Sequence, residues 1–184
     1  MDIEAAKEEL EELMIKGLLE YVKTGTFPNN SPDAYETAYT IVYNMSNLGH
    51  LESEALFEYH NKTIQKVIEY CYKIVSNETT TQLIDLFIKQ TENINFMIHW
   101  MNRIFNYLDK NYTKYNQKGI LSQNAINLYK QFFFNPLEED IYREVNKLIK
   151  EDRNCNLDSR SKIKTILNIE YHNMNLRILI QNNL

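Results

Sequence analysis

The residues whose types could support catalysis or metal binding are few: His50, His60, His99, His172, Cys71, Cys155 and the acidic run 138–140. No histidine or cysteine is spaced from another as metal ligands are, and no glycine-rich phosphate loop, HExxH or GxSxG motif occurs. Cys71 falls on the apolar line of a predicted helix, where a small buried filler is expected. The acidic run falls in the first turn of another predicted helix, where the helix dipole favours it. The sequence therefore predicts no enzyme, no metal site and no cofactor.

A second set of residues suits protein recognition. Tyr35, Tyr39 and Tyr43 recur every four residues, on one side of a helix predicted over 32–47. The apolar positions of this helix cluster about 140° away, and they are Ala34, Ala38, Ile41, Met45 and Leu48. If the protein's own domain covers only one side of this helix, one of its two apolar faces is left uncovered. Either another layer of the same chain or a partner protein must cover the tyrosines.

The strongest apolar pattern lies in residues 93–115. Its stripe recurs at three- and four-residue steps and predicts a long core helix; the stripe is Ile94, Met97, Ile98, Met101, Ile104, Phe105, Leu108 and Tyr112. A second line of residues runs beside it, and its members are Trp100, Arg103, Tyr107 and Asn111. Side chains that combine an aromatic or apolar part with a polar end group suit either the edge of a core or a docking surface.

The remaining sequence predicts helices and no strand. The expected helices cover 4–23, 32–47, 50–75, 81–91, 93–115, 122–134, a stretch restarted at 136, and 158 to about 171. Ser31, Ser122 and Asp158 are the expected helix caps. We expect an all-α fold, a bundle or helical repeat of long helices joined by short loops.

Composition narrows the class of protein further. The chain has 184 residues and a net charge of −5, which disfavours binding to nucleic acid or anionic lipid. No apolar run approaches the ~18–20 residues that span a bilayer, and the acidic N-terminus does not resemble a signal peptide. Two distant cysteines are typical of a reduced compartment. We therefore expect an intracellular protein, cytoplasmic or nuclear, that binds neither nucleic acid nor membrane.

Three segments resemble the N-terminal part of the cullin family, the elongated scaffolds of multi-subunit ubiquitin ligases. They are Tyr39–Met45 (YTIVYNM), Met97–Tyr112 (MIHWMNRIFNYLDKNY) and Val145–Arg153 (VNKLIKEDR). The first resembles the second-helix motif of the SCF-type cullin. The other two resemble the fifth-helix signature and the opening of the second cullin repeat. Their order and spacing match, although Gln90 stands where many cullins have a Trp.

The resemblance implies a first cullin repeat of five helices at residues 4–116 and the start of a second at 117–184. It implies a non-catalytic scaffold segment of an SCF-type ubiquitin ligase. Its second and fifth helices would bind a Skp-like adaptor and, through it, F-box substrate receptors. The adaptor-binding residues implied in this way are Tyr35, Ala38, Tyr39, Val42, Tyr43, Tyr107, Asn111 and Lys114. The region that recruits the RING subunit is missing, so no RING partner is expected for this chain.

Several alternatives stay open. The same face would suit a BTB-type adaptor. A natural short form would sequester the adaptor as a decoy, and a structural helical-repeat protein would oligomerise through the tyrosines. All of these depend on one expectation, which is that Tyr35, Tyr39 and Tyr43 are not covered by the chain's own helices.

Overall fold

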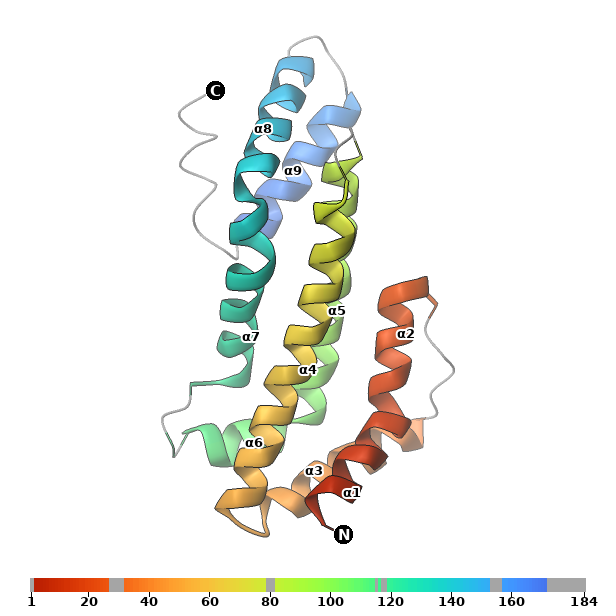
Figure 1. Ribbon diagram of the computed structural model, residues 1–184, viewed down its shortest axis with the longest axis vertical. Coiled ribbons are helices and arrows are strands. Elements are labelled where there is room, and N and C mark those ends of the chain that lie inside the picture. The colour runs from red at the N-terminus through yellow and green to blue at the C-terminus, as the bar shows by residue number, and fades with distance from the viewer. Residues whose placement is uncertain are drawn as a thin grey trace.

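The computed structural model describes residues 2–26, 32–78, 82–114, 116, 119–152 and 157–171. Every regular element in these ranges is a helix, so the predicted all-α fold is confirmed. The molecule is elongated, and α4 (His50–Ser76) and α5 (Leu83–Ile104) lie side by side along its long axis (Figure 1). The helices α7 (Leu121–Tyr129) and α8 (Asn135–Asp152) follow one another along one side of this pair (Figure 1). The predicted cap Ser31, Cys155 and the tail from His172 lie outside the described residues.

The first helical stretch runs from α1 (Ile3–Leu10) through a π turn, η1 (Glu11–Ile15), into α2 (Lys16–Thr24). Its buried positions recur at every fourth residue, and they are Ala6, Leu10, Met14, Leu18 and Val22. A four-residue repeat drifts by about 40° per step around a straight α-helix. The wider π turn offsets this drift, so positions on both sides of it face the same core.

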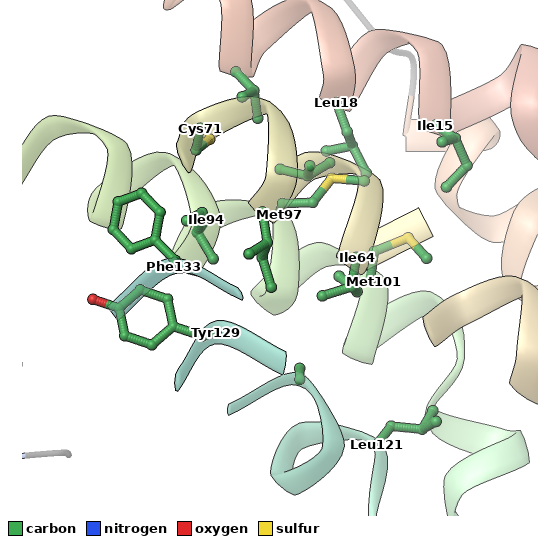
Figure 2. Packing of buried hydrophobic residues seen from close by; sticks show 14 of the residues in the cluster. Ile15, Leu18, Ile64, Cys71, Ile94, Met97, Met101, Leu121, Tyr129 and Phe133 are labelled. Carbon is green, nitrogen blue, oxygen red and sulfur yellow. The ribbon is translucent and has the colours of Figure 1, made fainter. Parts of the chain in front are cut away.

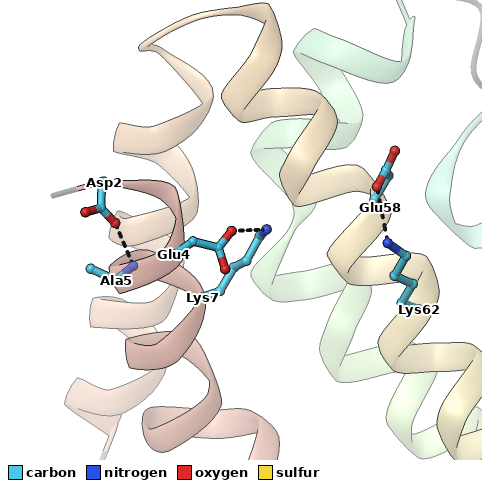
Figure 3. A network of polar contacts seen from close by, with 6 residues as sticks. All are labelled: Asp2, Glu4, Ala5, Lys7, Glu58 and Lys62. Atoms are coloured by element: carbon cyan, nitrogen blue, oxygen red, sulfur yellow. Dashed lines mark hydrogen bonds and ion pairs between the residues drawn. The ribbon is translucent and has the colours of Figure 1, made fainter.

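Polar contacts fix the start of this stretch. The Asp2 side chain accepts a hydrogen bond of 2.8 Å from the Ala5 N–H and so caps α1. Figure 3 shows this cap together with two exposed ion pairs, Glu4–Lys7 at 2.7 Å and Glu58–Lys62 at 3.3 Å. Exposed pairs of this kind contribute little to stability. Packing of the apolar faces must therefore supply most of it.

The two helices predicted over 81–91 and 93–115 have different boundaries in the structure. One helix, α5, passes through residue 92 without a break, because no Gly or Pro interrupts the apolar pattern there. The break comes at Phe105, whose backbone leaves the helical region at φ −92° and ψ 11°. Buried Asn93 of α5 donates a hydrogen bond of 3.2 Å to the Val22 carbonyl. It thereby satisfies an acceptor in the last turn of α2.

The predicted boundary at Asn135 coincides with the start of α8 (Asn135–Asp152), but the predicted break of the chain at that point is absent. The helix α7, the π turn η3 (Lys130–Phe134) and α8 form one continuous helical stretch. Proline in a regular α-helix clashes with the carbonyl four residues earlier. The π turn directly before Pro136 widens the backbone and lets the helix pass through. Glu138 lies in the first turn of α8, as predicted for the acidic run 138–140, although α8 continues the helix before it. Glu138 accepts a hydrogen bond of 2.9 Å from the Tyr142 hydroxyl.

One hydrophobic cluster runs through the molecule and joins the helices on both sides of residue 116. The Phe87 ring of α5 stacks on the Phe133 ring of η3 at 5.5 Å, and both side chains are fully buried. Figure 2 shows other members of this cluster; among them are Ile64 and Cys71 of α4, Met97 and Met101 of α5, and Leu121 and Tyr129 of α7. The last helix, α9 (Leu157–Tyr171), packs on α8 and α5, and it begins one residue before the predicted cap Asp158.

Asp109 replaces the predicted cap Ser122 at the start of α7. It begins the π turn η2 (Asp109–Thr113), and its Oδ1 accepts a hydrogen bond of 2.8 Å from the Leu121 N–H. The same oxygen accepts a second hydrogen bond, of 2.9 Å, from the Thr113 hydroxyl. One carboxylate thus ties the end of one helical stretch to the beginning of the next.

Asp109→Ala is expected to lower the free energy of unfolding by about 1–2 kcal/mol, because the Leu121 N–H at the start of α7 loses its acceptor. Asp109→Asn keeps an oxygen acceptor and is expected to cost less than half as much. Urea unfolding followed by circular dichroism would measure both. An equal loss in the two variants would show that the charge matters and the capping geometry does not.

Candidate protein-docking surface

The helix α3 (Pro32–Ser46) has the two faces that its sequence predicts. Its inner face is buried against α1, α4 and α6 (Asn106–Leu108). The buried side chains of this face are Ala38, Ile41, Val42 and Met45. Leu48, predicted on the same face, lies beyond the end of the helix and is 64% exposed.

The three tyrosines of α3 are not sealed beneath the chain's own helices. Tyr35 and Tyr39 are half-buried, with ring centroids 6.5 Å apart, and Tyr43 is 43% exposed. Each ring is therefore held on one side and open on the other. This is the condition on which a docking role for these residues depends.

Aromatic contacts bring α3 together with α5 and α6. The Tyr35 ring meets Trp100 of α5 edge-on at 6.1 Å, and the Tyr43 ring meets Tyr107 of α6 edge-on at 4.5 Å. The Tyr107 hydroxyl also donates a hydrogen bond of 2.9 Å to Oδ1 of Asn47, just after α3. We refer to Tyr35, Tyr39, Tyr43, Trp100 and Tyr107 as the ring layer.

The structure separates the eight predicted site residues into groups. Ala38 and Val42 have no exposed area, because they point into the core and anchor α3. A direct contact between these two side chains and a partner, as predicted, does not fit this placement. Asn111 and Lys114 are exposed on and just after η2, and the Asn111 amide donates a hydrogen bond of 2.9 Å to the Tyr107 carbonyl.

Three residues of this surface were not among the predicted site residues: Trp100, Arg103 and Asn47. The Arg103 guanidinium carbon lies 5.4 Å from the centre of the Tyr35 ring and 5.3 Å from that of Trp100. The line formed by Trp100, Arg103 and Tyr107 along the predicted helix is a signal that could have identified the first two. Asn47 follows a helix end, and nothing in its spacing indicates its contact with Tyr107.

Two titratable side chains outside this surface, Cys71 and His60, are buried in the core. Cys71 is fully buried, and burial raises the pKa of its thiol to about 12. Burial likewise lowers the pKa of His60 to about 4, against weaker opposing effects from Asn61, Asn102 and Asp109. Within the described ranges, no three His, Cys, Asp or Glu side chains gather as a metal site would require. None of the helices in the described part of the chain combines the length and the hydropathy that a membrane span requires.

Comparison with known proteins identifies the class of this fold. The family model of the cullin alpha solenoid domain matches residues 8–176. The chain is also 23% identical over 145 residues to Cullin-1 of rice, Oryza sativa subsp. japonica. That alignment covers 77% of this chain and 20% of the rice protein, so the chain spans a small part of its relative's length. Because the family match covers most of the chain, this protein belongs to the cullin family, whose solenoid domain is a scaffold fold.

Proposed function

We propose that this chain is the non-catalytic scaffold segment of an SCF-type ubiquitin ligase and binds a Skp-like adaptor through the ring layer. F-box substrate receptors would join through that adaptor. We further propose that residues 4–116 and 117–184 correspond to a first cullin repeat and the start of a second. The cytoplasm or nucleus is the compartment in which these partners would meet.

The observation that carries the proposal is the partial exposure of the ring layer. Tyr43 is 43% exposed although its ring packs on Tyr107, so the pair is ordered before any partner arrives. Side chains that are already ordered lose less conformational entropy on binding. Tyrosine and tryptophan are also the residue types enriched among interface residues that dominate binding energy. The cullin family match and the likeness to rice Cullin-1 support this class of partner.

The test is binding of a purified Skp-like adaptor to the chain with Tyr39→Ala and Tyr43→Ala combined. Aromatic anchors at the centre of an interface cost about 2 kcal/mol or more each when truncated. We expect the pair to weaken binding at least a hundredfold, as measured by titration calorimetry. Helicity by circular dichroism should be retained, since neither ring is fully buried.

Tyr70→Ala is the matched control, because Tyr70 is 39% exposed but lies in the C-terminal half of α4. It should leave adaptor binding unchanged. Equal affinity of the double variant and the unmodified chain would refute the assignment of this surface. A BTB-domain protein in the same titration separates the two adaptor classes. Light scattering of the chain alone tests oligomerisation through the tyrosines, which a concentration-independent monomer would rule out.

A further inference from the structure

Arg103 is a cation held in place by aromatic rings at the edge of the ring layer. It lies in the last turn of α5 and its side chain is exposed. Its guanidinium carbon is 5.4 Å from the Tyr35 ring centre and 5.3 Å from the Trp100 ring centre. The two rings stand 6.1 Å apart and edge to face, at 71°. The planar group is therefore fixed by rings from two helices, α3 and α5.

The donors of Arg103 are not used within the described chain. Arg103 makes no hydrogen bond or ion pair with a described residue. This includes exposed Glu36, the neighbour of Tyr35 in sequence. Contact with aromatic rings engages the π faces of a guanidinium and leaves the N–H groups at its edge able to donate. Arg103 thus offers a preoriented fork of donors beside a surface shaped for protein contact.

Two further cations follow Arg103 in the sequence, in and just after η2. Lys110 and Lys114 are exposed there, and neither forms an ion pair with a described residue. The acidic group just before them, Asp109, carries the opposite charge and accepts hydrogen bonds from the Leu121 N–H and the Thr113 hydroxyl. The segment 103–114 therefore holds three cations and one carboxylate, a formal charge of +2, although the whole chain carries a net charge of −5. A partner that docks here would meet a local charge opposite to that of the molecule as a whole.

We propose that Arg103 binds a carboxylate of the adaptor and so selects a partner that presents an acidic side chain beside the ring layer. This inference rests on the proposed function, because the adaptor must already dock on α3 and α6. A guanidinium pairs with a carboxylate through two parallel N–H donors, which adds geometric specificity to charge attraction. The rings that fix the plane of the guanidinium reduce the conformational freedom lost in forming that pair.

The test compares binding of a purified Skp-like adaptor by Arg103→Gln, Arg103→Lys and the unmodified chain at low and high salt. Arg103→Gln removes charge and fork, and we expect at least a tenfold loss of affinity and a weaker salt dependence. Arg103→Lys keeps the charge without the fork and should fall between the two. Lys110→Gln, a nearby exposed cation away from the rings, is the control and should change affinity less than threefold.

A second experiment identifies the carboxylate. Adaptor variants with single Asp→Lys or Glu→Lys changes are titrated against the Arg103→Glu chain. One of them should bind this chain at least tenfold more tightly than the unmodified adaptor does. The inference is overturned if Arg103→Gln binds with unchanged affinity and salt dependence while Tyr39→Ala with Tyr43→Ala abolishes binding. The proposed function stands in that case. Failure of the unmodified chain to bind the adaptor overturns both.

Discussion

Phe133→Ala is expected to lower the free energy of unfolding by about 3–5 kcal/mol, the usual cost of deleting a fully buried phenyl ring. The ring stacks on Phe87 at 5.5 Å and lies 5.3 Å from the Tyr129 ring, so the vacated space is walled by rigid groups. Domains of this size are stable by about 5–15 kcal/mol. The variant should therefore lose a large fraction of the total stability, and its unfolding midpoint in urea should fall clearly, as circular dichroism would show.

Phe132→Ala is the matched control for this prediction. Phe132 precedes Phe133 in the same π turn, η3, and undergoes the same change in side chain and helix propensity. It is only half-buried, so its loss should cost less than about 2 kcal/mol. Equal instability of the two variants would show that the assignment of Phe133 to the core and of Phe132 to its edge is wrong.

Acidification from pH 6.5 to pH 4 is expected to destabilise the fold by about 3 kcal/mol through His60 alone. Burial holds the pKa of this histidine near 4, against 6.5 for an exposed histidine. Between these values the unfolded chain binds a proton that the folded chain does not, so the stability falls as pH falls. The difference between these two pKa values corresponds to about 3 kcal/mol, and the full loss of stability is reached only below pH 4.

His60→Gln removes the titrating group and keeps a polar side chain. The difference in unfolding free energy between this variant and the unmodified chain should shift by about 3 kcal/mol across that pH range. Carboxylates that titrate nearby affect both proteins and cancel in the difference. A parallel pH profile for His60→Gln and the unmodified chain would contradict the prediction.

Apolar periodicity predicted the buried faces of the helices well. The stripe from Ile94 to Tyr112 is buried almost throughout, and α3 begins and ends within one residue of its predicted bounds. The errors lie where a local rule was overridden. Pro136 sits inside a continuous helix because a π turn precedes it, and the rule that proline ends a helix does not anticipate that turn. The cap of α7 comes from Asp109, twelve residues upstream of Leu121, which no local pattern reveals.

The candidate site was predicted only in part, because local spacing reveals the faces of one helix but not the contacts between helices. Spacing alone separated the tyrosines from the apolar face of α3, because both sets lie on one element. The pairing of Tyr35 with Trp100 and of Tyr43 with Tyr107 arises only when α3 crosses α5 and α6. Val42 lies between the two faces on the helical wheel, and only its complete burial assigns it to the core.

The continuous helical stretch from Leu121 to Asp152 has a mechanical consequence. At about 1.5 Å per residue it forms a strut on the order of 45–50 Å long, with no hinge where Pro136 would ordinarily place one. Deleting one residue from η3 would turn everything beyond it by about 100° around the strut axis. The length of this helical stretch and the number of residues in η3 therefore set the distance and the direction in which the chain continues beyond it.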